Sequence, residues 1–295
     1  MPNGTFSLAL DSTQMALFLE CPQKWYLTWI QQLHKDNNYT KPLDKGSLMH
    51  YLLEHYHKSY FYSKNFVEAQ KYALDLSRKW FKNETHTLTK EDYTLVTTRF
   101  TQYLFYWFSN ELQTMAVNGE PAVEMGFSLP LVDNPDFHFV LEGKIDRFAQ
   151  TKNGLEMFVD YKTQGQYKII NKRRIQFKNY SLACGKSRGM IDIIGLQADL
   201  KEGYLRRDLT YFSPPELQRW KSEVIKIFYQ VANCVLNNIY PHNWESCDGK
   251  YGYLCNFSEL CECVDPQIYE NIKHTKYHIA KEWTPWAVDE SEGEE

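Results

Sequence analysis

The chain has 295 residues, of which 43% are hydrophobic and 24% charged, and this ordinary globular composition excludes a largely disordered protein. No apolar run approaches the ~18 residues that span a bilayer, and residues 1–10 lack the pattern of a secretory signal. We therefore expect a cytoplasmic protein without a membrane partner. The net charge of −4 is concentrated at the end, because residues 289–295 hold five acids and are expected to form a disordered acidic tail.

The first part of the chain has the periodicity of helices. Asp11 can cap a first helix, and Gly46 opens a second helix that carries His50. Two further helices are predicted over residues 66–80 and 89–116. This part of the chain is therefore expected to be mostly helical.

After Pro121 the pattern changes to the alternation of strands. The predicted elements are strands over residues 123–129, 137–149 and 155–162, a helix over 169–183, strands over 190–199 and 204–212, and a helix over 213–240. We expect one domain over residues 1–288, with a mostly helical part (1–120), an α/β core (121–240) and a cysteine-rich segment (241–264).

Two short motifs on neighbouring strands carry the candidate chemistry: G-K-I-D, which ends at Asp146, and D-Y-K, which runs from Asp160 to Lys162. Alternation places Asp160 and Lys162 on one strand face. Facing carboxylates repel each other, and a hard cation such as Mg2+ removes that cost, while a lysine beside them can stabilise phosphate charge. The alternative is a solvated strand with ordinary charges.

The register of the hairpin decides whether the two acids meet. A two-residue Asn153-Gly154 turn would place Asp146 opposite Tyr161. A three-residue loop over 152–154, with Gly154 left-handed, would place Asp146 opposite Asp160. We predict the three-residue loop, because glycine is common at that position in such loops.

Other candidate residues are weaker signals when taken singly. His50 follows Gly46 by four residues, Glu124 lies on the strand before G-K-I-D, and Gln176 and Tyr180 are one helical turn apart after D-Y-K. A lone helical histidine is more often a packing or surface residue.

In this order the motifs G-x-x-x-H, G-x-I-D, D-x-K and Q-x-x-x-Y resemble those of the PD-(D/E)XK nuclease superfamily, in its RecB-like branch. That branch includes the nuclease domains of RecB and AddB and the CRISPR-adaptation nucleases. The resemblance runs from about Asp11 to Cys261. It implies an α/β, restriction-endonuclease-like fold: a mixed central sheet flanked by helices, with a helical N-terminal region and a cysteine-rich C-terminal staple.

The resemblance also implies a role for each motif residue. It makes Lys162 the catalytic lysine and Glu124 a helper acid, and it places Gln176 and Tyr180 at the DNA or the edge of the active site. It implies that Mg2+ or Mn2+ is bound by the side chains of His50, Asp146 and Asp160 and by the carbonyl oxygen of Tyr161.

The seven cysteines are odd in number, which argues against a disulfide framework in a chain without a signal, and four of them fall between residues 247 and 263. That clustering favours a metal. The pattern of one early and three late cysteines resembles the iron–sulfur staple of the AddB-type relatives, which implies a 4Fe–4S cluster on Cys21, Cys247, Cys255 and Cys261.

Two alternatives stay open for the cysteines. Cys263 can replace Cys247 as the fourth ligand, because the gap from Cys247 to Cys255 is wider than usual. Zinc also binds four thiolates, and the spacing does not exclude it. Cys184 and Cys234 lie on apolar helix faces and are expected to be buried thiols.

The resemblance therefore implies a metal-dependent deoxyribonuclease, an exonuclease acting on single-stranded or end-opened DNA in recombination, repair or processing. The chain has no P-loop motif, so a helicase or recombination protein is an expected partner besides DNA. The alternatives are a DNA-binding recombination or adaptation factor with a weak or vestigial nuclease site, and a site-specific endonuclease.

Overall fold

A computed structural model describes residues 5–35, 41–82, 86–110, 112–166, 168–197, 204–248 and 254–279. The chain forms two compact units that interleave along the sequence. The first unit comprises Met1–Asn38, Ser128–Gly143 and Gln218–Glu295, and the second comprises Tyr39–Phe127 and Lys144–Leu217. The single nuclease domain over residues 1–288 stays a prediction, and the acidic tail over 289–295 lies outside the described residues.

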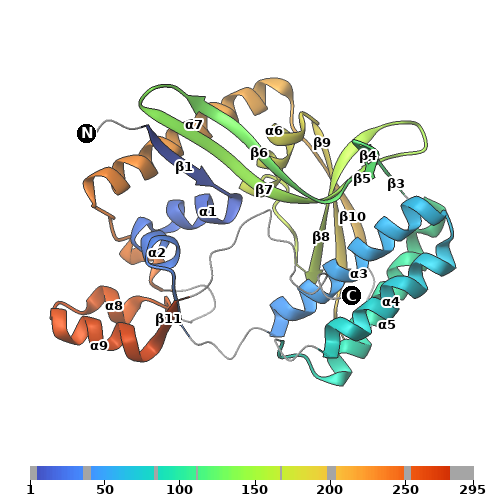
Figure 1. The fold of residues 1–295 in the computed structure, drawn as a ribbon, viewed down its shortest axis with the longest axis horizontal. Coiled ribbons are helices and arrows are strands. Elements are labelled where there is room, and N and C mark those ends of the chain that lie inside the picture. The colour runs from blue at the N-terminus through green and yellow to red at the C-terminus, as the bar shows by residue number, and fades with distance from the viewer. Residues whose placement is uncertain are drawn as a thin grey trace. The chain divides into compact units, whose positions relative to one another are not determined.

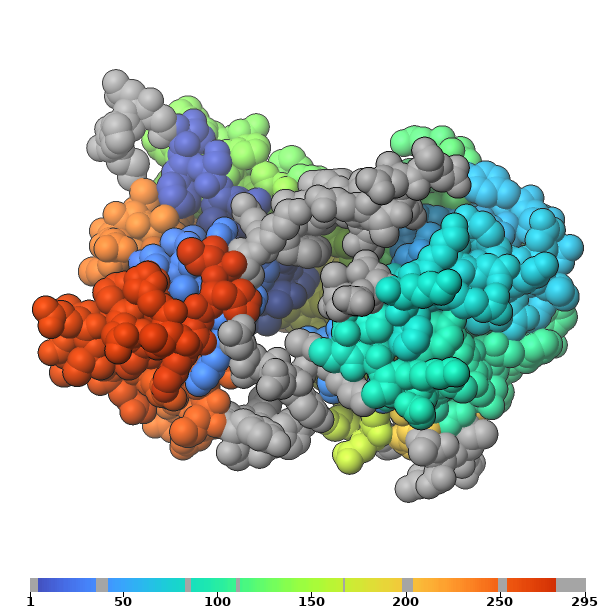
Figure 2. Space-filling view, turned by 60° about the horizontal axis from the view of Figure 1, so that its bottom comes forward, coloured from blue at the N-terminus to red at the C-terminus, as the bar shows by residue number. Residues whose placement is uncertain are grey.

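The second unit begins with three helices that pack together (Figure 1). They are α3 (Lys41–Ser63), α4 (Phe66–Lys82) and α5 (Lys90–Trp107). Thr89 and Asp92 form a capping box that starts α5. In the space-filling view α4 and α5, coloured cyan to green, form an outer surface of this unit (Figure 2).

The predicted helix over 89–116 is too long. Helix α5 ends at Trp107 and a 3-10 turn, η2 (Phe108–Asn110), follows. The next residues form β3 (Gln113–Thr114), which pairs with Gln150 and Ala149. Pairing with the sheet satisfies backbone groups that a longer helix would have satisfied internally, so a tertiary contact overrides the local helical pattern.

The second unit is built on a mixed sheet, as the fold class predicted. Strand β7 (Phe137–Gln150) pairs with β8 (Glu156–Gln164) in antiparallel fashion, β8 pairs with β9 (Arg188–Gly195) in parallel, and β9 pairs with β10 (Leu205–Tyr211) in antiparallel fashion. Helix α6 (Ile175–Cys184) connects the two parallel strands. The strands and helices predicted for this region are thus present, although α6 begins later than predicted.

Two apolar clusters cover the two faces of this sheet. Val159 and Tyr161 pack into the cluster that α3, α4 and α5 form, whereas Phe158 packs against Phe177 of α6. These residues alternate along β8, so consecutive side chains enter different layers. The central sheet is therefore flanked by helices, which confirms the predicted restriction-endonuclease-like α/β architecture.

The β7–β8 hairpin has the predicted three-residue register. Gly154 has φ +75°, the left-handed conformation that glycine adopts without strain, and Thr151 N–H donates to the Leu155 carbonyl at 3.0 Å. Arg147 pairs with Val159, and continuing this register sets Asp146 across from Asp160.

The first unit contains both ends of the described chain. Strand β1 (Phe6–Leu10) runs parallel to the first half of β7. The Asp11 side chain caps the following helix, as predicted. The helices that follow in this unit are α1 (Ser12–Glu20), α2 (Pro22–Trp25), the π-helix η1 (Tyr26–Ile30), most of α7 (Pro214–Asn237), η3 (Trp244–Ser246), α8 (Ser258–Glu262) and α9 (Pro266–Lys276).

The remaining strands are short or pass between the units. Strand β2 (Leu33–Lys35) pairs with β11 (Tyr277–Ile279) in the first unit, and β4 (Ala116–Val117) pairs with β5 (Glu120–Pro121) in the second. Strand β6 (Val123–Asp133) pairs with β7, and both strands run through the two units. No helix in the described part of the chain is long and apolar enough to cross a bilayer.

Candidate active site

Helix α3 brings a histidine to the middle of β8. The helix passes the strand at Gly46, where an added Cβ would lie only 3.3 Å from Thr163 Oγ1, so a larger residue would crowd this crossing. One turn later, His50 Nε2 lies 3.1 Å from the Tyr161 carbonyl oxygen. A carbonyl can only accept, so Nε2 is the donor, and Nδ1 is left for the acids. In the G-x-x-x-H motif, the glycine thus lets the helix approach the strand closely, and the histidine one turn later contacts that strand.

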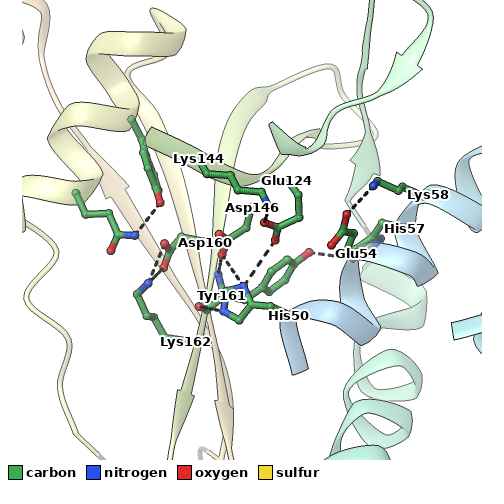
Figure 3. A network of polar contacts seen from close by, with 12 residues as sticks. His50, Glu54, His57, Lys58, Glu124, Lys144, Asp146, Asp160, Tyr161 and Lys162 are labelled. Carbon is green, nitrogen blue, oxygen red and sulfur yellow. Dashed lines mark hydrogen bonds and ion pairs between the residues drawn. The ribbon is translucent and has the colours of Figure 1, made fainter. Parts of the chain in front are cut away.

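Two carboxylates of the second unit face that nitrogen (Figure 3). His50 Nδ1 lies 3.6 Å from Asp146 Oδ2 and 3.7 Å from Glu124 Oε1. One ligand atom from each of these three residues lies within 4.8 Å of the other two, which is a spacing that a single cation can bridge. Lys144 Nζ lies 3.1 Å from Glu124 Oε2 and partly balances the charge.

The backbone at Glu124 has an uncommon conformation. Its φ is +51°, in the left-handed region that costs a residue with a Cβ about 1–2 kcal/mol. Such conformations occur at sites where the surrounding fold imposes them. Here the left-handed residue carries one of the carboxylates at His50, so the local strain accompanies a functional group.

Asp160 and Lys162 form a second pair, on the opposite face of β8 from the Tyr161 side chain. Lys162 Nζ lies 3.0 Å from Asp160 Oδ1 and 2.9 Å from Oδ2. Burial raises the pKa of Asp160 to about 7, although Lys162 opposes this shift. Burial also disfavours the charge on Lys162, but Asp160 and Asp146 outweigh it and raise its pKa. The lysine is therefore a cation at neutral pH, held by the first acid of D-x-K.

These groups fit a divalent cation. Burial would lower the pKa of His50, but Asp146 and Glu124 outweigh burial and raise the pKa to about 9. A proton on His50 and a cation are alternative ways to balance the charges of Asp146 and Glu124. Moreover, Asp160 Oδ2 accepts no hydrogen bond among the described residues, although Lys162 lies near it. Carboxylates and an imidazole whose other nitrogen donates to a carbonyl are typical metal ligands.

The set of residues around His50 differs in part from the set predicted to hold the metal. Glu124, predicted as a helper acid, lies with His50 and Asp146, whereas Asp160 pairs with Lys162. The Tyr161 carbonyl accepts from the His50 ring.

Gln176 and Tyr180 lie together on α6. Gln176 Nε2 donates to the Tyr180 hydroxyl at 2.7 Å. Burial raises the pKa of Tyr180 well above 10, and the charges of Asp160 and Asp146 add to this shift, so the hydroxyl lies in the field of the acids. The phenol is neutral and can donate a hydrogen bond beside them.

Two features near the site were not assigned a role from the sequence. Lys144, inside G-K-I-D, pairs with Glu124. Behind the site, His57 and Arg147 contact the Tyr161 hydroxyl. The sequence contains one indication of the position of His57: it follows His50 by seven residues, a spacing that places both side chains on one face of a helix.

The first unit contains a separate group of cysteines. All seven cysteines of the chain are free thiols. Burial raises the pKa of Cys261 to about 12, and Cys255, Cys21 and Cys247 add to this shift. Burial likewise raises the pKa of Cys247, with further contributions from Cys255 and Cys21. Each of these four thiols therefore lies within electrostatic range of others in the group.

The local backbone explains how this group is held. Cys255 N–H donates to the Cys247 carbonyl at 2.9 Å, and Asn243 N–H donates to Cys21 Sγ at 3.4 Å. Cys255 and Cys261 pack against an apolar cluster that includes Leu27, Leu33, Phe257, Leu260 and Tyr277. The Cys263 thiol instead points to the Asp265 carbonyl, at 3.4 Å.

Two solved structures and one family model are similar to this chain. A solved structure of a candidate exonuclease from Eubacterium rectale is 13% identical, with 87% of this chain and 94% of that chain covered and a TM-score of 0.45. The solved structure of SSO0001 is 9% identical, with 79% and 76% covered and a TM-score of 0.34. No curated protein matches the sequence. The family model of the PD-(D/E)XK nuclease superfamily matches residues 11–262, and the chain therefore belongs to this superfamily of nucleases.

Proposed function

We propose that this nuclease is a metal-dependent deoxyribonuclease of the RecB-like branch that degrades DNA from an end. The observation that carries the proposal is the group of acids around His50, with the Asp160–Lys162 pair on the neighbouring strand. Cleavage of a phosphodiester needs an activated water and compensation of the charge that develops on the phosphate. This group supplies acids to hold a cation and a separate ammonium group.

His50, Glu124 and Asp146 would hold Mg2+ or Mn2+, and Asp160 supplies a further carboxylate beside them. The cation supplies a water of lowered pKa and Lewis-acid polarisation of the phosphate oxygen. Lys162 is oriented by Asp160 and can donate to a non-bridging phosphate oxygen or to the attacking water. Tyr180, which is oriented by Gln176, can donate to a neighbouring phosphate.

Lys162→Ala is expected to lower the cleavage rate at saturating DNA by about 100-fold or more, which is typical of the loss of one electrostatic stabiliser. Lys162→Arg should not restore it, because a planar guanidinium places its charge differently. Lys186→Ala is a matched control, because Lys186 pairs with Glu156, an acid at the start of the strand β8 that also carries Lys162. Single-turnover kinetics would check this, and full activity of Lys162→Arg would mean that only bulk charge is needed.

The raised pKa values of Asp160 and His50 predict a pH-dependent response to metal. In each case the folded-state pKa, about 7 and about 9, exceeds the ordinary values of 3.8 and 6.5. These shifts stabilise the metal-free folded protein at pH values below the ordinary pKa values. The stabilisation is lost as the pH rises through the folded-state pKa values. The cation binds the deprotonated groups, so the rise in Tm caused by Mn2+ should grow from pH 5 to pH 9. Thermal melts with and without Mn2+ measure this, and a shift independent of pH would contradict it.

A second cofactor, a 4Fe–4S cluster, is proposed on Cys21, Cys247, Cys255 and Cys261. The mutual effects of these thiols on their pKa values support a shared site. Zinc is the alternative occupant, because four thiolates also bind zinc.

The mode of cleavage is tested by incubating the purified chain with Mg2+ or Mn2+ and end-labelled linear or closed circular DNA. Loss of the linear substrate alone supports an exonuclease, whereas nicking of the circle supports an endonuclease. DNA binding without cleavage of either substrate would contradict the proposal and favour a DNA-binding factor with a vestigial site. We propose a helicase or recombination protein as the partner that opens duplex ends, since the sequence has no P-loop motif of its own.

A further inference from the structure

A buried polar cluster lies behind the active strands of the second unit. Arg147 Nη1 lies 3.0 Å from the Tyr161 hydroxyl and 2.6 Å from His57 Nε2, and the hydroxyl lies 2.9 Å from the same His57 nitrogen. Arg147 Nη2 also donates to the Leu112 carbonyl. Arg147 and Tyr161 are each 1% exposed and His57 is 3% exposed, so these contacts are made without competition from bulk water.

The chemistry of Arg147 and His57 limits how they can hold the Tyr161 hydroxyl. Burial, together with the charges of Arg147 and Arg207, holds the pKa of His57 well below 6.5, so its ring is neutral. Arginine can only donate. Arg147 therefore donates to the Tyr161 oxygen, and both Arg147 Nη1 and the Tyr161 hydroxyl face the single lone pair of His57 Nε2. The Tyr161 hydroxyl is thus held between Arg147 and His57.

The peptide groups of the same tyrosine hold two residues of the site (Figure 3). Tyr161 N–H donates to Asp146 Oδ2 at 2.7 Å, and the Tyr161 carbonyl accepts from His50 Nε2 at 3.1 Å. His50 and His57 lie two turns apart on α3. One helix thus contacts Tyr161 at its carbonyl and at its hydroxyl, and the strand is held between the two contacts.

We propose that Arg147, His57 and the Tyr161 hydroxyl are positioning residues for the metal site. They fix the Tyr161 backbone, and through it they orient Asp146 and His50. This inference rests on the proposed function, because it takes Asp146 and His50 to bind the cation. It adds a role for three side chains that lie on the far side of the sheet from Asp160 and Lys162.

The test measures Mn2+ binding directly, by loss of the electron paramagnetic resonance signal of free Mn2+, in the full chain. Tyr161→Phe removes only the hydroxyl. We expect Mn2+ affinity to fall about 10–100-fold, the range found when an outer partner of a metal ligand is lost. Tyr93→Phe is the control, because the Tyr93 hydroxyl hydrogen-bonds to Ser77 of α4 rather than to the cluster behind the site. It should bind Mn2+ as the unaltered protein does.

A second pair of variants covers the case in which Tyr161→Phe does not fold. His57→Leu removes the acceptor and should weaken Mn2+ binding, whereas His57→Gln supplies another acceptor and should restore most of the affinity. Unchanged Mn2+ affinity in Tyr161→Phe, or equal affinity in the two His57 variants, would overturn the inference and leave the proposed function intact. If the unaltered chain bound no Mn2+, the proposed metal site and this inference would both be wrong.

Discussion

Replacing Asp160 by alanine is expected to lower DNA cleavage by at least about 1,000-fold. Asp160 is fully buried beside Lys162, and burial raises its pKa to about 7. The ionised carboxylate is therefore favoured only where nearby cations balance its charge. The substitution removes one carboxylate from the proposed cation site and the partner that orients Lys162. Losing a single stabilising group from an active site commonly costs about 100- to 1,000-fold, and here two functions are lost together.

DNA affinity should change less than about tenfold in the same variant, because phosphate contacts elsewhere supply most of the binding. Asp75→Ala is a suitable control, since Asp75 is exposed and pairs with Arg78 on α4. Single-turnover cleavage and DNA binding in Ca2+ separate the two effects. Unchanged turnover in Asp160→Ala would remove Asp160 from the proposed site and, with it, the assigned role of the D-x-K motif.

The site's central geometry could be predicted from the sequence because local rules determine it. A glycine at position 154 selects a three-residue loop, and that loop sets the register that brings Asp146 opposite Asp160. Alternation along β8 then places Lys162 beside Asp160. Each step depends on a few neighbouring residues, so no long-range information was needed.

Other features depend on contacts between distant segments. The end of α5 at Trp107 follows from the pairing of β3 with β7, which local helical periodicity cannot report. The left-handed backbone at Glu124 could not be predicted in the way that it could at Gly154. Glycine commonly adopts this conformation, whereas a glutamate in the sequence does not suggest it. The contacts of His57 and Arg147 with Tyr161 join residues 104 and 14 positions apart, respectively, and polar pairs at such separations have no sequence pattern.

Loss of Cys21, Cys255 or Cys261 is expected to abolish the proposed 4Fe–4S cluster. Cys21 precedes the other proposed ligands by more than 220 residues, so a metal bound by all four would tie both ends of the described first unit together. Freshly purified protein should be brown, with broad absorbance near ~400 nm from the thiolate-bound cluster. Each alanine variant should lose this absorbance and become poorly soluble, because a metal that closes a site contributes directly to folding.

The remaining cysteines identify the fourth ligand and the metal. Cys247→Ala should be colourless, since Cys247 shares the electrostatic environment of Cys21 and Cys255. On this assignment Cys263→Ala should stay brown, and the reverse pattern of colour would make Cys263 the fourth ligand. Cys184→Ala, which alters a thiol of the second unit, should also keep the colour. Colourless anaerobic protein with one equivalent of zinc would refute the iron–sulfur assignment, but it would leave the nuclease site intact, because the two sites use different residues.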